Sequence, residues 1–337
     1  MRFEQLARRG KEFLGVDIPI LAGAMTWISD YHLVRAISDA GGFGALAAGN
    51  MPPDLFEAEV DRCLSGLQHP FAVNLITIAP HYRVHAEILQ SKKVPFVVFA
   101  GSFPRKSDIL AMQRAGIRAM SFASERSIAQ QQIQFGIDAL ILEGSEAGGH
   151  IGHVSLTILL QQVLFDFDQV PVFVGGGVAR GTMIAHLMLM GAAGVQMGTR
   201  FVMTDECGAH PAFKEAFRRA RARQAIATPQ YDSKLPVVAV RAIKNKGHEA
   251  FGTLQLSLLR RLEAGEITRE AAQFEVERFW VGALRNAVVD GDVERGSLMA
   301  GQSVGLVDQI QPVARVLQGL VDEAEEELAR VAGVLGQ

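Results

Sequence analysis

The sequence predicts a (β/α)8 TIM barrel with a smaller helical domain inserted after the eighth strand. Three observations predict it: eight short apolar runs recur through the first 200 residues, helix-period segments separate them, and the pattern changes after about residue 205. Short, nearly continuous apolar runs are typical of strands buried on both faces of a parallel sheet. The runs occupy residues 18–23, 43–49, 71–76, 95–101, 117–123, 138–144, 171–177 and 193–198.

The segments between these runs have the period of amphipathic helices. Residues 30–42 place Leu33, Val34, Ile37 and Ala40 on one face, and residues 182–192 form another apolar helical stretch. An open, doubly wound sheet is the alternative architecture. No GxGxxG follows the first strand and the glycine-rich strand ends come late, so the barrel is favoured.

The C-terminal part of the chain has a different pattern. Residues 206–290 are charged and helix-rich, with one short apolar run at 235–243, and we expect them to form a small lid or substrate domain. Residues 1–205 and 291–337 would then form the barrel. The tail from about residue 307 has helical period and should pack back on the barrel. Its acidic run from Asp322 to Glu327 is interpreted as a solvated face, with a binding role as the alternative.

Composition excludes several classes of protein. With 49% apolar and 20% charged residues, the chain must bury a large core, which excludes a disordered protein and a coiled coil. A net charge of -3 argues against nucleic-acid binding. Two cysteines cannot form a disulfide framework or a four-cysteine metal site, and their scarcity suits a cytoplasmic protein. The first residues lack a signal peptide's apolar run, and no stretch reaches the ~18 apolar residues of a membrane span.

Two glycine-rich strand ends predict a phosphate site. The seventh run ends in Gly175, Gly176 and Gly177, and the eighth is followed by Gly198 and Thr199. In barrels of this kind the loops after strands seven and eight, with a helix N-terminus, commonly bind phosphate. A glycine triplet alone would indicate only a tight turn. Glycines at both expected strand ends together predict a phosphate-bearing ligand.

The segment after the sixth run carries the strongest catalytic candidate. It begins at Glu143 and continues through Gly148 and Gly149 to His150. A histidine after a Gly-Gly pair can project over the barrel mouth, where an imidazole can donate or take a proton near neutral pH. A solvent-facing histidine on a capped turn is the alternative. His153 is a second candidate for the same role.

Other residues suit a flat cofactor or a partner. Ala24 and Met25 follow the first strand, although Met25 could equally be a core residue. Asn74 ends the third strand, and its amide can both donate a hydrogen bond to a heterocycle and accept one from it. His81 and His85 are spaced for a metal but lack a third ligand, so a helix surface is favoured and no metal is expected. His186 is interpreted as a core residue. A cluster of basic residues follows the eighth strand. It is either a solvated helix or a docking patch for an acidic carrier or a nucleotide phosphate. Its members are Lys214, Arg218, Arg219, Arg221 and Arg223.

Taken together, these stretches resemble the FMN-dependent nitronate monooxygenase family, also called 2-nitropropane dioxygenases. Within that family the chain is most similar to the FabK-type flavin enoyl-[acyl-carrier-protein] reductases. The resemblance covers most of residues 18–307. The matching stretches are PILAGAMTWISD, ISDAGGFGALAAGN, PFAVNL, EGSEAGGHIG, VFVGGGVARG, AAGVQMGTRFVMTDEC, VRAIKN and VVDGDVERGSLMAGQSVGLV.

The resemblance implies FMN in the barrel mouth, with His150 as the active-site histidine. The phosphate would lie on Gly176, Gly177, Gly198 and Thr199. Seven further residues would lie near the isoalloxazine ring or on the turn beside it: Ala24, Met25, Asn74, Gly148, Gly149, Met299 and Gln302. We assign Glu143, Gln196 and Met197 to the same cofactor site.

The implied activity is NADH- or NADPH-dependent reduction of trans-2-enoyl thioesters, on acyl carrier protein or as small molecules, by a possible homodimer. A nitronate monooxygenase using O2 and an NAD(P)H:quinone reductase are the enzymatic alternatives. A non-catalytic sensor that binds a flavin or a phosphate is the third. Residues 231–236 depart from the histidine- and glycine-bearing stretch that FabK-type enzymes tend to carry before VRAIKN, which leaves the choice of substrate open.

Overall fold

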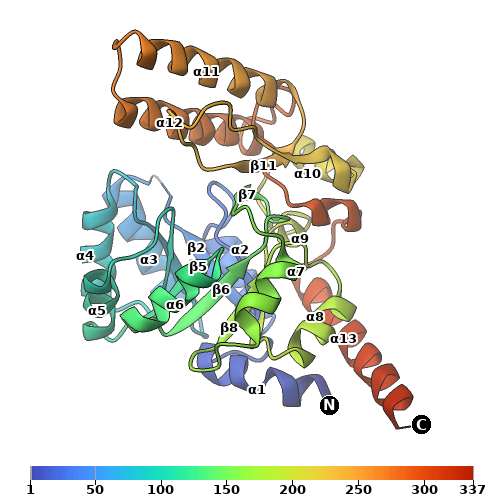
Figure 1. The fold of residues 1–337 in the computed structure, drawn as a ribbon. Coiled ribbons are helices and arrows are strands. Elements are labelled where there is room, and N and C mark those ends of the chain that lie inside the picture. Colours follow the sequence, from blue (N-terminus) through green and yellow to red (C-terminus); the bar gives the residue numbers. More distant parts are fainter. Residues whose placement is uncertain (1, 50, 337) are drawn as a thin grey trace.

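The computed structural model describes residues 2–49 and 51–336. Eight parallel strands close into a barrel in the order β1-β2-β3-β4-β5-β6-β8-β9, which confirms the predicted fold (Figure 1). Each of the eight apolar runs contains one of these strands. They are β1 (Ile20–Ala22), β2 (Phe43–Ala47), β3 (Ala72–Ile76), β4 (Phe96–Ala100), β5 (Arg118–Ala123), β6 (Ala139–Glu143), β8 (Val172–Gly175) and β9 (Gly194–Met197).

Helices surround the barrel and begin or end at residues suited to those positions. Asp30 caps the helix that follows β1, because its side chain accepts a hydrogen bond from the Leu33 N–H. Gly136 ends the helix before β6 in the left-handed conformation. The helices of this layer are α1 (Arg2–Leu14), α2 (Tyr31–Asp39), α3 (Pro53–Gly66), α4 (Tyr82–Lys92), α5 (Lys106–Arg114), α6 (Arg126–Phe135), α7 (Leu156–Leu159), α8 (Gly181–Leu189) and α9 (Thr199–Val202).

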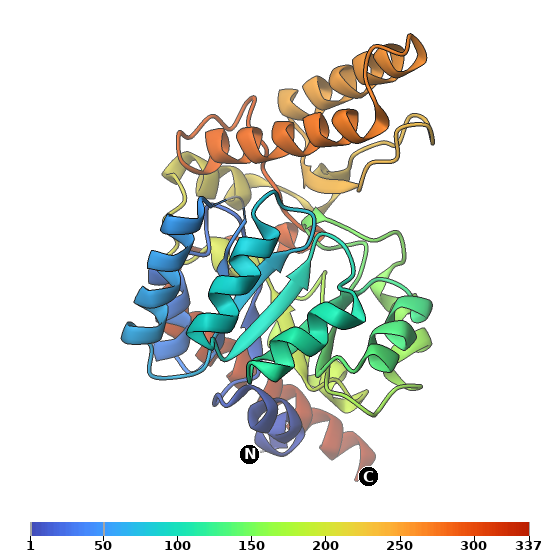
Figure 2. The same ribbon diagram turned by 90° about the vertical axis from the view of Figure 1, so that its left-hand side faces the viewer.

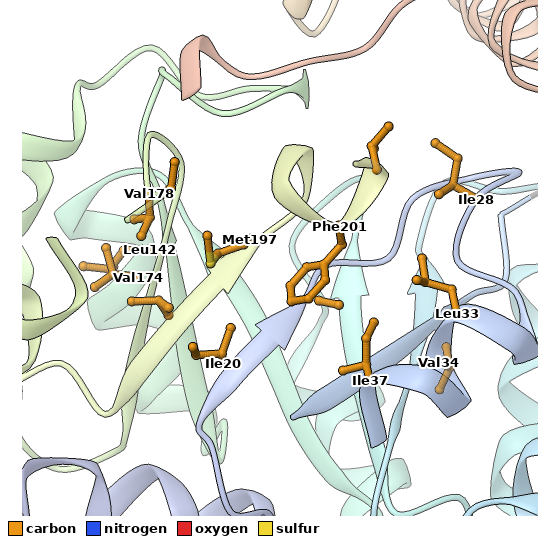
Figure 3. Packing of buried hydrophobic residues seen from close by; sticks show 14 of the residues in the cluster. Ile20, Ile28, Leu33, Val34, Ile37, Leu142, Val174, Val178, Met197 and Phe201 are labelled. Carbon is orange, nitrogen blue, oxygen red and sulfur yellow. The ribbon is translucent and has the colours of Figure 1, made fainter. Parts of the chain in front are cut away.

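Alternating residues of the strands separate an inner core from an outer one. Leu21, Ala72 and Ile141 belong to a cluster inside the barrel. Residues of the opposite parity, such as Leu142 and Met197, pack between the strands and the helices (Figure 3). This parity decides which strand-end side chains point into the mouth of the barrel.

A second, smaller sheet stands above the barrel. It consists of β10 (Ala225–Ala227), β11 (Val240–Ile243) and β7 (Gly149–His150), in the order β10-β11-β7 with antiparallel pairing. Two long helices, α11 (Lys246–Glu263) and α12 (Arg269–Val288), cover one face of it and lie over the end of the barrel at which β7 emerges (Figures 1 and 2). The helix α10 (Pro211–Arg219) precedes β10 in the chain. The strand β7 belongs to the barrel part of the sequence, so the small sheet contains strands from both predicted domains. The division of the chain into two domains at residues 206 and 290 therefore stays a prediction.

The last helix, α13 (Val313–Leu335), packs along α8 in the layer around the barrel, with further contacts to α1 and α2, and its C-terminal part extends past the lower end of the barrel (Figure 1). Its acidic run is in part solvated as expected, since Asp322, Glu323 and Glu326 are exposed, but three of its carboxylates also contact neighbouring helices. Glu323 accepts a 2.8 Å hydrogen bond from the Gly181 N–H at the start of α8, and Glu325 accepts from the first N–H groups of α1. Glu327 lies 2.7 Å from Nε2 of His186. Helix N-termini need such acceptors, which explains why acidic side chains occur here.

His186 also differs from its interpretation as a core residue. Its side chain is 48% exposed and is held by Glu327 on the surface between α8 and α13. Across the described residues, each helix is too short or too polar to cross a membrane.

Candidate active site

Three polar side chains occupy the inner face of the barrel at the carboxyl ends of its strands. Asn74 shares its parity with Ala72, and Glu143 shares its parity with Ile141, both of which are inner-core residues. Gln196 pairs across the sheet with Leu21, which is also inside. An otherwise apolar barrel interior therefore ends in a polar layer at its mouth.

The amides in this layer are fixed by close contacts. Asn74 is buried, and its Nδ2 donates a 3.2 Å hydrogen bond to the Val98 carbonyl, which fixes the orientation of the amide. The Gln196 side chain crosses Gly23, where an added Cβ would lie 3.1 Å from Nε2. A side chain at position 23 would displace Gln196, so the glycine keeps this amide at the mouth.

Glu143 is the strongly perturbed acid of the mouth. Burial raises the pKa of its carboxyl to about 8, and desolvation is the cause of this shift. The group is therefore protonated at neutral pH before a ligand arrives. A neutral carboxyl can donate a hydrogen bond as well as accept one, which suits the polar edge of a heterocycle.

The loops after β8 and β9 have the backbone that a phosphate needs. Gly176 and Gly177 have φ of +88° and +74°, a region that glycine adopts without strain. An added Cβ on Gly176 would lie 3.0 Å from the Gly144 carbonyl oxygen, so the β6 and β8 loops pack backbone against backbone. The N–H groups of Gly177, Gly198 and Thr199 donate no hydrogen bond to any described residue. Such unpaired donors beside one another fit a phosphate group.

Most of the remaining flavin candidates surround this layer. The Met25 sulfur lies 3.6 Å from the position of a Cβ on Gly198, and Gly149, with φ of +77°, turns toward the Met299 sulfur. Ala24 belongs to the same β1 loop as Met25, and Gly148 packs tightly on the backbone of residues 300–301. The Gln302 N–H donates to the Glu146 carbonyl, which joins this segment to the β6 loop.

Met197 is the exception among these candidates. Its side chain is 2% exposed and lies in the outer core beside Leu142 and Val174 (Figure 3). Only its backbone can therefore face a ligand in the mouth.

His150 and His153 point to different places. His150 lies on β7 opposite Val240, and its Nε2 is 3.5 Å from Oε2 of Glu277 on α12. His153 instead lines a cleft of about 390 Å³ with Thr228 and Arg241. The imidazole of His150 is 45% exposed, which leaves it open to a substrate. Sequence reasoning missed Glu277, because one glutamate in a charged helix carries no local signal.

The other candidates have structural roles. His85 is buried, stacks on Phe56 at 4.1 Å between ring centroids and has its Nε2 3.1 Å from the Met51 carbonyl, so the expected helix-surface position is wrong. Within the described residues, no group of three potential ligands could hold a metal ion.

The basic cluster is smaller than the sequence indicated. Lys214 is buried and donates a 2.7 Å hydrogen bond to the Thr204 carbonyl, so it is not part of a surface patch. Arg218 and Arg219 both pair with Glu215. Arg221 and Arg223 are exposed in the turn that follows α10.

Comparisons with known proteins identify the family of this chain. The profile of the nitronate monooxygenase family matches residues 8–85 and 76–323. The structure of FabK from Thermotoga maritima is 32% identical, with a TM-score of 0.85 over 97% of this chain and 98% of that one. Nitroalkane oxidase from Streptomyces ansochromogenes is 25% identical, with a TM-score of 0.78 over 95% and 99% of the chains.

A curated relative has a substrate linked to coenzyme A in its name. It is the (3aS,4S,5R,7aS)-5-hydroxy-7a-methyl-1-oxo-octahydro-1H-indene-4-carboxyl-CoA dehydrogenase of Mycobacterium tuberculosis, which is 27% identical over 96% of this chain and 98% of that protein. The barrel, the phosphate-type loops and these matches along nearly the whole chain lead to one conclusion. The chain belongs to the nitronate monooxygenase family of FMN-dependent oxidoreductases.

Proposed function

We propose that this protein is an NAD(P)H-dependent reductase of trans-2-enoyl thioesters, with acyl carrier protein or coenzyme A as the thiol component. The observation that carries the proposal is the 32% identity to FabK along 97% of the chain, which includes the region of α11 and α12 above the mouth. The relative named as a carboxyl-CoA dehydrogenase supports a thioester as the substrate class.

The residues at the mouth fit FMN, which when bound would supply two-electron transfer between a nicotinamide and an acceptor. The unpaired N–H groups of Gly177, Gly198 and Thr199 would hold its phosphate. Asn74 and Gln196 would hydrogen-bond the polar edge of its ring system, and Glu143 would do so in its protonated form.

His150 would manage the proton of the reaction. Reduction of an enoyl thioester places negative charge on the thioester oxygen and requires a proton at the α-carbon. A half-exposed imidazole between β7 and α12 can stabilise that oxygen or deliver the proton.

Anaerobic stopped-flow spectroscopy of the purified holoenzyme tests the proposal. We expect NADH or NADPH to bleach the flavin absorbance rapidly, and a trans-2-enoyl thioester to restore it with formation of the saturated thioester. Absence of bleaching with either nucleotide would overturn the reductase proposal.

A nitronate monooxygenase is the second candidate, favoured by the family match and by the similarity to nitroalkane oxidase. In that activity His150 would take the α-proton of a nitroalkane. This alternative predicts oxygen consumption with an alkyl nitronate and no requirement for reduced nicotinamide.

A further inference from the structure

We propose that Glu277, on α12, is a positioning residue that orients the imidazole of His150. The role of His150 in proton transfer rests on the proposed function, whereas the contact between these two side chains does not. Its carboxylate lies 3.5 Å from Nε2, within ion-pair distance and slightly longer than a strong hydrogen bond.

The small sheet directs His150 toward α12. His150 pairs with Val240 on β11, and cross-strand partners point to the same face of a sheet. Val240 is fully buried in the cluster beneath α11 and α12, together with Phe251 and Trp280. The imidazole therefore lies on the helix side of the sheet, where Glu277 can reach it.

Helix α12 contacts the barrel mouth at a second point. Arg285 lies over the indole of Trp27, 5.9 Å from the ring centroid, and also pairs with Asp290 at 2.8 Å. Eight residues separate Arg285 from Glu277, which corresponds to about 12 Å along a helix. The loop after β1 and the strand β7 thus both hold α12, which fixes the position from which Glu277 faces His150.

The contact with Trp27 is supported by an unusual backbone. Trp27 has φ of +68°, which is strained for a bulky residue, and it is 47% exposed. The turn is held by Ser29, whose hydroxyl accepts a 2.9 Å hydrogen bond from the Met25 N–H. The same loop therefore presents Met25 to the proposed flavin site and Trp27 to α12.

A carboxylate beside Nε2 has a defined effect on an imidazole. It keeps a proton on Nε2 and restricts the ring to one orientation. With Nε2 turned to Glu277, Nδ1 is the ring nitrogen left for a substrate. Contacts of this kind are often long before the substrate binds and shorten in the complex.

Two substitutions and a matched control test the proposal in the holoenzyme. Glu277→Gln should slow the acceptor half-reaction about 10-fold, a fraction of what acid–base groups contribute, with kcat changing more than KM. Glu277→Asp should recover part of that loss. Glu275→Gln is the control, because Glu275 lies on the same helix but pairs with Arg261. Reduction by NAD(P)H should be unchanged in all three.

A double-mutant cycle separates positioning from a structural effect. In a His150→Ala background, Glu277→Gln should cause no further loss, because the residue acts through the imidazole. Additive losses, or an equal loss in Glu275→Gln, would overturn the proposal.

Nitrogen NMR of the oxidised, [15N]histidine-labelled holoenzyme gives a readout without any substrate. The His150 signals, assigned by their disappearance in His150→Ala, should show a protonated Nε2 in the wild type and a shifted tautomer distribution in Glu277→Gln. Identical ring signals in both proteins would contradict the proposal. Failure of the reductase assignment would instead appear in the wild type as a lack of thioester reduction, so the two failures are distinguishable.

Discussion

At the scale of single residues, His150 and His153 allow a direct comparison of two imidazoles in one loop. We expect His150→Ala to retain FMN and reduction by NAD(P)H while losing ~10²–10⁴-fold in the acceptor half-reaction, the range that general acid–base groups supply. His153→Ala should lose much less, because His153 faces the cleft beside Arg241 and not α12. Single-turnover kinetics of the two half-reactions measure both effects. A wild-type acceptor rate in His150→Ala would refute the assignment.

Gly198 provides a test of the phosphate site that separates charge from shape. Its φ of -112° is accessible to any residue, and an added Cβ would make only ordinary contact with Met25. Gly198→Asp should weaken FMN binding about 100-fold, because a carboxylate would face the phosphate within a few ångströms. Gly198→Asn has nearly the same shape without the charge and should bind FMN far better. Titration of the two flavin-free variants with FMN gives their dissociation constants. If both variants bind FMN equally weakly, the phosphate does not lie beside residue 198.

Glu143 predicts a pH-dependent stability of the flavin-free protein. Burial raises the pKa of Glu143 from 4.5 to about 8, so between these values the unfolded chain loses the proton before the folded chain does. Stability should therefore fall as the pH rises through this window, by about 1.4 kcal/mol per pH unit for this group, and level off above it.

The variant Glu143→Gln has no titrating group at this position and serves as the reference. The stability difference between wild type and variant, measured by urea unfolding, should move in favour of the variant from about pH 5 to about pH 8. Parallel pH profiles would show that the carboxyl is not desolvated in the folded protein.

At the scale of secondary-structure elements, the acidic run of α13 accepts hydrogen bonds from the N-termini of α8 and α1. Glu323→Ala removes the acceptor for the first N–H of α8 and should destabilise the protein by about 1 kcal/mol, as loss of a helix cap does. Asp322→Ala is the matched control, because among the described residues the Asp322 side chain bonds only to Gln318, one turn away on its own helix. Denaturant unfolding of both variants measures the difference. Equal effects would mean that the cap contributes nothing.

The eight barrel strands could be predicted because each is a continuous apolar run whose burial is visible locally. The sheet β10-β11-β7 could not, since its strands have two to four residues and come from segments far apart in the sequence. Its existence depends on long-range pairing, and β7 contains a glycine that carries no strand signal.

The same distinction applies to the candidate site. The position of Asn74, Glu143 and Gln196 at the barrel mouth could be predicted because strand ends can be located in the sequence. Neighbouring residues of a strand point to opposite faces, so the side chains of Gln196 and Met197 cannot both face the cofactor. The sequence-based assignment of both residues to the cofactor site overlooked this alternation, which places Met197 in the outer core. Glu277 and Arg285 had no such signal, because charged residues on a helix usually face solvent.

At the scale of the whole molecule, the two arginines after α10 are the predicted docking site for the acidic carrier of the proposed function. Arg218 and Arg219 are exposed but paired with Glu215, whereas Arg221 and Arg223 are exposed and form no ion pair with any described residue. The double variant Arg221→Glu/Arg223→Glu should weaken activity with a carrier-protein thioester more than with its CoA analogue. The extra loss should shrink at high salt, because charges are screened beyond about 8 Å at physiological ionic strength.

The matched control is Arg8→Glu/Arg83→Glu, which changes the net charge equally on α1 and α4. It should affect both substrates alike. Equal losses for the two substrates in Arg221→Glu/Arg223→Glu would exclude docking at this patch and leave the reductase proposal untouched.

The arrangement of α1 and α13 has a practical consequence for handling the enzyme. Figure 1 shows α1 at the end of the barrel opposite to α11 and α12, and α13 runs along α8 toward that same end. Leu335 is 81% exposed, so a linker added there leaves the packing of α13 intact. Attachment through either helix to a resin, an electrode or a carrier particle would therefore hold the molecule with its opening toward the solution, and immobilisation need not compete with turnover.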